Sequence, residues 1–265
     1  MKIYLSVDME GITGLSSWDE VLKEKKDYCN KQLTQEVKAA CQGAIAAGAK
    51  EVWINDAHDS GRNIDFAKLP PNTKLISSWS GNPLSMMQEL DESFTAALMI
   101  GYHSASGTET NPLAHTMSSK LNYLKINGEP VSEFIISAYT AAMFKVPVVF
   151  LSGDQGVCQE VKEINKNIET VAVKEGKGKS VISIHPEQAK DNIKKGVEQA
   201  LTAPLEKYQL KLPEYFKVEL SFTAQAHPQA YKASFYPGMK KLSATKVLFE
   251  TQDYFEVLKM ILFVL

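Results

Sequence analysis

Hydrophobic and polar positions follow two different periods along this chain. Short apolar runs bounded by glycine or polar residues predict strands, and apolar residues spaced three or four positions apart predict helices. Up to residue 165 the chain shows predicted strands at 2–7, 51–55, 96–101, 123–126 and 146–151, and predicted helices at 31–47, 130–144 and 153–162. This alternation predicts an α/β fold: a mixed, largely parallel sheet with helices on both faces.

The pattern loosens after residue 165. It predicts a loop at 176–179, a helix at 186–200, strands at 218–223 and 245–249, and a closing helix at 253–263. We therefore expect two parts, a core of residues 1–165 and a smaller C-terminal α+β lobe of residues 166–265 packed on it. The alternative is that all 265 residues form one domain, because a chain of this length can bury one large core.

Composition narrows the class of protein. A net charge of −2 and a pI near 6.2 provide no general attraction to nucleic acid or to an acidic membrane. The longest apolar run, 260–265, is too short to span a bilayer. Three cysteines, an odd number without metal-type spacing, fit a reducing compartment. With no signal-peptide pattern at the start of the chain, we expect a cytoplasmic protein without nucleic-acid or membrane partners.

Polar side chains with metal-binding chemistry stand at three predicted strand ends. Asp8 and Glu10 follow strand 2–7, His58 follows 51–55, and His103 follows 96–101. Ligands of open α/β sheets bind beyond the carboxyl ends of the strands. Two neighbouring carboxylates repel each other unless a cation lies between them. Carboxylates together with imidazoles suit Zn²⁺, Mn²⁺ or Co²⁺ better than Ca²⁺, so the pattern predicts a metal site in the 1–165 core.

Two further residues are candidates on weaker grounds. Glu133 lies near the start of helix 130–144, where favourable interaction with the helix dipole is an alternative explanation. His115 lies in the polar loop that follows His103. If that loop folds back over the strand ends, the imidazole lies beside the metals and can move protons or stabilise an oxyanion.

Each candidate also has an ordinary structural explanation. Asp8 can accept backbone N–H groups in its turn, Glu10 can be a solvated loop residue, and His58 can stabilise its own loop. Asp56 and Asp59 flank His58, and we expect them to orient its ring. Spacing alone predicts a metal site but does not identify the reaction.

Longer sequence blocks point to a family. The blocks are SVDMEGITG (6–14), NDAH (55–58), GYH (101–103), HTM (115–117) and INGEPVSE (126–133). In this order they resemble the M55 family of D-aminopeptidases. The resemblance implies a dinuclear zinc enzyme that removes N-terminal D-amino acids from short peptides such as D-Ala-D-Ala. It also implies a homodecameric ring that encloses the active sites and limits substrates to short peptides.

The resemblance assigns a role to each candidate. It implies that Asp8 bridges two divalent cations, Zn²⁺ with Mn²⁺ or Co²⁺ as alternatives. Glu10 and His103 complete one metal site, and His58 and Glu133 complete the other. A hydroxide bridging the metals attacks the peptide carbonyl. The resemblance makes His115 the catalytic histidine, which we expect to act as a base or stabiliser rather than as the nucleophile.

Other functions remain open from the sequence. Residues 15–30 depart from the family pattern directly after the metal loop, which affects the expected substrate preference. One alternative is a dinuclear hydrolase of another amide or of a phosphoester, although Arg62 is the only arginine and no phosphate clamp is visible. A second alternative is a non-catalytic, peptide-binding member of the family.

Overall fold

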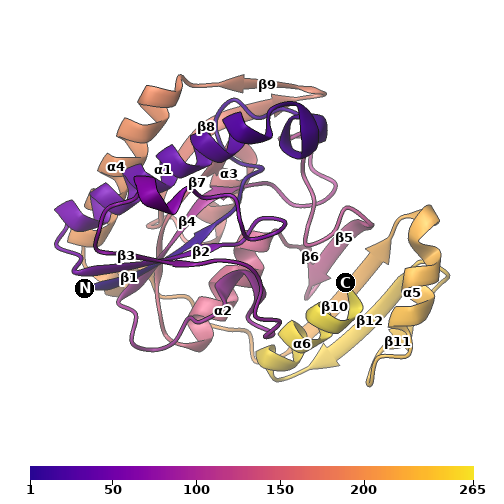
Figure 1. The fold of residues 1–265 in the computed structure, drawn as a ribbon. Coiled ribbons are helices and arrows are strands. Elements are labelled where there is room, and N and C mark those ends of the chain that lie inside the picture. The colour runs from indigo at the N-terminus through magenta and orange to yellow at the C-terminus, as the bar shows by residue number, and fades with distance from the viewer.

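A seven-stranded sheet forms the larger part of the molecule (Figure 1). The computed structural model describes residues 1–265, apart from the side chain of Leu22. All neighbouring strands of this sheet are parallel except the last pair, so the predicted largely parallel α/β sheet is confirmed. In spatial order the strands are β3 (Thr73–Ile76), β2 (Glu51–Asp56), β1 (Lys2–Val7), β4 (Ala96–Tyr102), β7 (Val148–Asp154), β8 (Glu169–Lys177) and β9 (Ser180–Ser183).

Helices cover both faces of this sheet. α1 (Lys26–Ala46) and α4 (Pro186–Thr202) pack against each other over one face, and α2 (Glu133–Met143) covers the other (Figure 1). α3 (Gln155–Ile164) packs against β7 and β8. Because β1 is covered on both sides, residues 3–7 are all buried. Strands in such positions are rich in apolar residues, and the sequence pattern therefore predicts β1 clearly.

A second, antiparallel sheet of five strands forms the smaller lobe. Its order is β11 (Lys240–Lys241), β12 (Lys246–Thr251), β10 (Phe216–Phe222), β5 (Leu121–Ile126) and β6 (Glu129–Pro130). α5 (His227–Ala233) and α6 (Tyr254–Val264) pack on it. The hydroxyl of Tyr254 donates to the carbonyl of Ile136 in α2 at 2.7 Å, which ties the lobe to the core.

The two sheets divide the chain differently from the predicted boundary at residue 165. The smaller sheet takes residues 121–130 from the first half of the chain, and residues 169–202 add two strands and α4 to the larger part. Strand pairing between distant segments decides this division. Local periodicity carries no information about such pairing.

Several elements differ from the prediction in extent. α1 begins at Lys26 rather than at residue 31, and the predicted loop 176–179 contains the turn of the β8–β9 hairpin. The strands β3, β6, β8, β9 and β11 and the helix α5 were not predicted, and α2 begins at Glu133 rather than at residue 130. The short helical turns are η1 (Glu20–Glu24, a π-helix) and the 3₁₀ turns η2 (Phe66–Lys68), η3 (Ser85–Met87), η4 (Leu205–Tyr208) and η5 (Ala224–Ala226).

The apolar C-terminal segment 260–265 is packed in part: Met260, Ile261 and Val264 are buried, whereas Leu262 and Phe263 are exposed. α6 buries Val257, Leu258 and Met260 between the small sheet and α2. Within the described part of the chain, every helix is too short or too polar to cross a bilayer.

Candidate metal centre

The loop that carries the first two candidate ligands is fastened to the end of the neighbouring strand β4. The backbone N–H of Asp8 donates to Ile100 and that of Gly11 to Gly101, both at 2.8 Å. A Cβ atom at Gly11 would lie 1.7 Å from the carbonyl oxygen of Tyr102, so only glycine permits this approach. The carboxylates of residues 8 and 10 are thereby held beside His103.

Asp8 lies between two acid–imidazole pairs. The Nδ1 atom of His58 is 3.0 Å from a carboxylate oxygen of Glu10 and 3.4 Å from Oδ1 of Asp8. The Nε2 atom of His103 is 3.3 Å from Oδ2 of Asp8 and 3.4 Å from Oε2 of Glu133. Asp8 is 2% exposed, and the other four residues are also buried. Each oxygen of the Asp8 carboxylate therefore faces a different pair, which is the geometry of a bridging ligand.

The imidazoles of His58 and His103 each pair most closely with a different glutamate. The shortest contacts place His58 with Glu10 and His103 with Glu133. Donor atoms of Asp8, Glu10 and His103 lie within 4.8 Å of one another, and these three residues are the set that the family resemblance implies for one metal.

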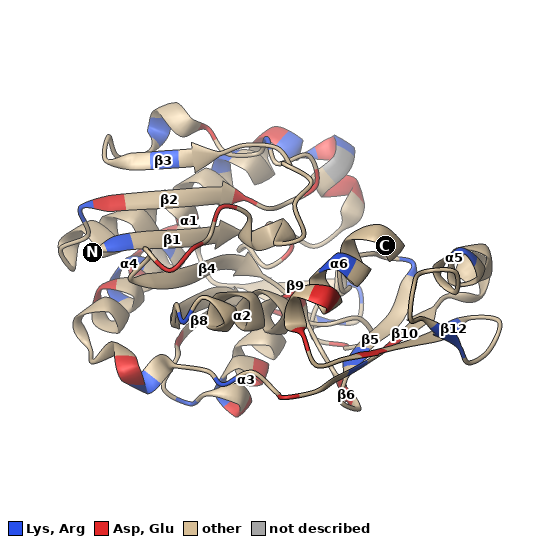
Figure 2. Ribbon diagram, turned by 90° about the horizontal axis from the view of Figure 1, so that it is seen from below, with Lys and Arg blue, Asp and Glu red and all other residues tan. Residues whose placement is uncertain are grey.

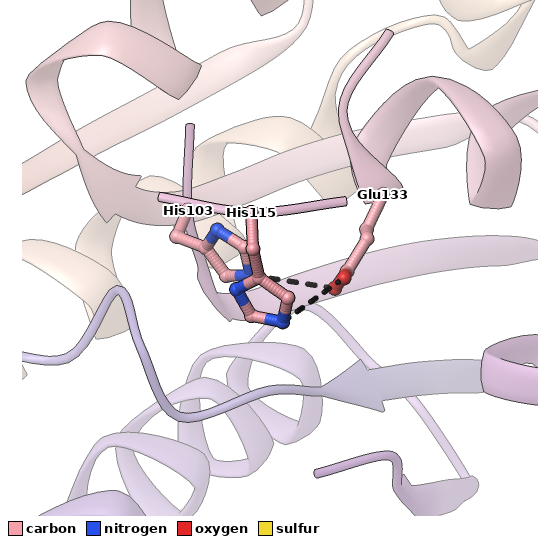
Figure 3. Close-up of side chains that lie close together, drawn as sticks. All are labelled: His103, His115 and Glu133. Carbon is pink, nitrogen blue, oxygen red and sulfur yellow. Dashed lines mark ion pairs between the residues drawn. The ribbon is translucent and has the colours of Figure 1, made fainter. Parts of the chain in front are cut away.

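His115 stacks on the ring of His103 (Figure 3), with centroids 4.4 Å apart and ring planes 14° apart. Its Nδ1 atom pairs with the carbonyl of Leu113 at 3.0 Å, and its Nε2 atom lies 3.5 Å from Oε1 of Glu133. The backbone N–H of Met117 donates to the same Oε1 atom at 2.6 Å. This bond folds the loop back over the strand ends, so all six predicted site residues lie together.

The electrostatics of the site reflect three buried carboxylates. Burial raises the pKa of Asp8 to about 7, and the charge of Glu10 adds to this. Burial would raise the pKa of Glu10 as well, but the imidazole of His58 holds it well below its usual range. Burial lowers the pKa of the two imidazoles, yet the carboxylates outweigh it and raise the pKa of His58 to about 11 and that of His103 to about 10. The positive charge of the protonated rings therefore offsets the negative charge of the carboxylates when no metal is bound.

The residues fit divalent cations. Oδ2 of Asp8 and Nε2 of His103 are buried without a hydrogen bond among the described residues, although buried polar atoms are normally paired. The Nδ1 atom of His103 pairs with the carbonyl of Ser104 at 2.9 Å, which directs Nε2 toward the site as in metal-ligating histidines. Carboxylate and imidazole donors together are typical ligands of Zn²⁺.

Two residues that support the metal loop were missed from the sequence. The Nζ atom of Lys174 donates to the carbonyls of Glu10 at 2.5 Å and Leu15 at 2.8 Å. The amide of Asn111 donates to the same Glu10 carbonyl at 3.0 Å and to Asp154 at 2.8 Å. Lys174 is 3% exposed, and burial lowers its pKa to about 8. Their partners are distant along the chain, and two of the three are backbone carbonyls, so no local pattern marks these residues.

The expected role of Asp56 was wrong. Its carboxylate accepts backbone N–H bonds from Asn63 at 2.5 Å and Ile64 at 3.0 Å, so it shapes the loop that carries His58 and does not orient the ring. Asp59 also makes no hydrogen bond to that ring among the described residues; its carbonyl accepts the indole N–H of Trp79 at 2.7 Å.

A cleft of about 480 Å³ opens over the site. The apolar part of its wall is formed by Trp18, Trp79, Met86, Met117 and Leu262. Neutral polar groups come from Asn82, Ser85, Gln88, Ser118 and Ser119. Trp18 comes from the segment 15–30 and packs edge-on against His115, with centroids 5.3 Å apart. The residues described as lining the cleft include no lysine or arginine.

A largely parallel α/β sheet with buried carboxylates and imidazoles at its strand ends, beneath an open cleft, defines a metal-dependent hydrolase. Comparison with known proteins supports this class. The profile of the M55 peptidase family, described as D-aminopeptidase, matches residues 1–263. A D-aminopeptidase of Bacillus subtilis (strain 168) is 33% identical over 260 residues, covering 97% of this chain and 93% of the relative.

A solved structure extends the similarity to the whole fold. It is the Zn-dependent D-aminopeptidase DppA from Bacillus subtilis, described as a self-compartmentalizing protease. It superposes with a TM-score of 0.91 at 30% identity and covers 100% of this chain and 96% of its own. The chain belongs to the M55 family of D-aminopeptidases.

Proposed function

We propose that this protein is a dinuclear metallo-aminopeptidase that releases N-terminal D-amino acids from short peptides such as D-Ala-D-Ala. The observation that carries the proposal is the position of Asp8, with one carboxylate oxygen toward His58 and Glu10 and the other toward His103 and Glu133. Membership of the M55 family supports the peptide substrate.

Two divalent cations are held by these five residues. Asp8, Glu10 and His103 would hold one, since their donor atoms lie within 4.8 Å of one another, and Asp8, His58 and Glu133 would hold the other. The donor set and the zinc dependence of the structural relative favour Zn²⁺, with Mn²⁺ or Co²⁺ as alternatives. When bound, the metals polarise the peptide carbonyl and lower the pKa of water enough to supply a nucleophile near neutral pH.

His115 handles a proton at its Nε2 atom. Its Nδ1 atom is engaged with the carbonyl of Leu113, which directs Nε2 toward Oε1 of Glu133 and the cleft. There it accepts a proton from the attacking water and returns it to the leaving amine. Stacking on His103 and the edge contact with Trp18 hold the ring in place.

A homo-oligomer, in the form of a decameric ring, is part of the proposal. Large apolar side chains are exposed on the small lobe, including Phe235 at 71% and Phe263 at 69%. An oligomer interface on this lobe would cover these apolar side chains. The structural relative is described as self-compartmentalizing, and a ring of this kind restricts substrates to short peptides.

Nucleic acid is not a proposed partner, because basic and acidic side chains are interspersed over the ribbon (Figure 2). A cytoplasmic location is proposed as well. The three cysteines are buried, and all three are free thiols.

The test combines metal analysis with a matched pair of substrates. Metals per chain are quantified in the purified protein, and D-Ala-D-Ala and L-Ala-L-Ala are assayed before and after chelation. About two zinc ions per chain with chelator-sensitive release of D-alanine supports the proposal. Two metals without peptide cleavage assigns the site to another amide or ester. No metal, and no activity after adding Zn²⁺ or Mn²⁺, rejects the metal site.

A further inference from the structure

One carboxylate in the cleft has no role in holding the metals. Four acidic residues line the cleft, and three of them, Asp8, Glu10 and Glu133, are the proposed ligands. The fourth is Asp59, which follows His58 directly in the chain. Its side chain is exposed, and its carboxylate makes no hydrogen bond or ion pair among the described residues. It is therefore a free negative charge in the cleft.

The backbone that presents Asp59 is fixed. Its φ of 45° lies in the left-handed region, which non-glycine residues rarely adopt and which recurs at functional sites. Three hydrogen bonds hold this conformation. The indole of Trp79 donates to the Asp59 carbonyl at 2.7 Å, the N–H of Gly61 donates to His58 at 2.8 Å, and the N–H of Ser78 donates to Gly61 at 2.8 Å. Because the loop is bonded on both sides, the backbone from which the Asp59 carboxylate extends is positioned before substrate binds.

The chemistry of the proposed substrate supplies a matching group. An aminopeptidase substrate carries an α-ammonium one carbon away from the carbonyl that is attacked. A carboxylate attracts such an ammonium by its opposite charge. The polar groups described as lining the cleft outside the metal centre are neutral apart from Asp59.

We propose that Asp59 binds the α-ammonium of the substrate and thereby restricts the enzyme to peptides with a free N-terminus. This inference rests on the proposed function. It adds recognition of the α-ammonium to the binding of the peptide carbonyl at the metal centre.

The experiment compares an amine with its neutral analogue. D-Alanyl p-nitroanilide carries the ammonium, and D-lactyl p-nitroanilide carries a hydroxyl in its place. The KM of the first and the inhibition constant of the second are measured for the wild type, Asp59→Asn and Asp191→Asn. Asp191→Asn removes an equal charge from the exposed surface of α4 and is the matched control.

Asp59→Asn is expected to raise the KM of the alanyl compound about tenfold to a hundredfold, the usual effect of losing a hydrogen bond to a charged group. Binding of the lactyl compound, the metal content and the behaviour of Asp191→Asn are expected to stay at wild-type values. An unchanged KM, or equal weakening of both compounds, overturns the inference and assigns the amine to a metal. Asparagine tolerates the left-handed backbone, and Asp59→Gly, which adopts it without strain, repeats the test if the first variant misfolds.

The two levels of the proposal fail in different ways. A metal-loaded wild type that cleaves neither D- nor L-alanyl substrates rejects the aminopeptidase function. A wild type that cleaves them, together with an Asp59→Asn variant of unchanged KM, rejects only the role of Asp59.

Discussion

The substitution Asp8→Asn distinguishes the contribution of Asp8 to metal binding from the destabilising effect of its buried charge on the fold. Asparagine keeps the shape of the side chain and removes its charge. The Asp8 carboxylate is 2% exposed, and its pKa is raised from 3.8 to about 7 by burial and by Glu10. The folded state therefore binds this proton more firmly than the unfolded state does. Its contribution to stability is complete below about pH 4 and is lost as the pH rises to about 7.

The magnitude follows from that difference in pKa. One pKa unit corresponds to about 1.4 kcal/mol, so ionised Asp8 costs the metal-free fold on the order of 4 kcal/mol above pH 7. At pH 8 in the presence of a chelator, we expect Asp8→Asn to unfold at higher urea concentration than the wild type. At pH 4 this advantage should disappear.

Adding zinc should make the wild type more stable than Asp8→Asn at pH 8. Ligand at a hundred times its Kd adds about 2.7 kcal/mol of stability for one site, and the wild type should gain this at each of its two sites. Asp8→Asn should gain little, because the residue shared by both sites no longer carries a charge. Urea unfolding of both proteins, with chelator and with zinc, measures all four values, and Asp191→Asn serves as the control.

Two results would refute the reasoning. If metal-free Asp8→Asn is less stable than the wild type at pH 8, repulsion among the buried carboxylates is not the dominant effect. If the variant gains the full stabilisation from zinc, Asp8 is not the bridging ligand.

Three further predictions follow from the site. His115→Gln should keep both metals and lower kcat on D-Ala-D-Ala by about 10²- to 10⁴-fold, and an unchanged kcat would assign the proton transfer to another group. Zinc binding at pH 8 should release about two protons per chain, because His58 and His103, with pKa values of about 11 and 10, must become neutral. Calorimetry in buffers of different ionisation enthalpy counts these protons, and an affinity that does not rise with pH contradicts protonated rings. Lys174→Met should lower zinc affinity by about tenfold or more, because the metal loop loses two buried hydrogen bonds, and wild-type affinity in a direct titration would remove Lys174 from this role.

The central strands of the larger sheet and four of the site residues were within reach of sequence reasoning. Apolar runs with polar ends identified β1, β2 and β4, and parallel strands bring their carboxyl ends to one edge. Asp8, Glu10, His58 and His103 therefore converge whatever the loops do. The positions of Glu133 and His115 could not be derived in this way. They depend on a hydrogen bond from Met117 to Glu133 that local periodicity does not encode.

The division of the chain into two sheets could not be predicted from the local sequence pattern either. β5 pairs with β10 across more than ninety residues of sequence, and β8 continues the large sheet after the predicted boundary. Strand pairing of this kind is decided by which edges can bury their faces together, and a single strand carries no signal for it.

By itself, the sequence determined the α/β class, the metal chemistry and the strand ends that supply it, since these depend on side-chain type and spacing along one segment. Only the tertiary structure decided which imidazole contacts which carboxylate, which pKa values shift, and that Lys174 supports the metal loop. Those properties depend on burial and on distances between segments far apart in the chain. Charges interact strongly only when folding has brought them together and removed the water between them.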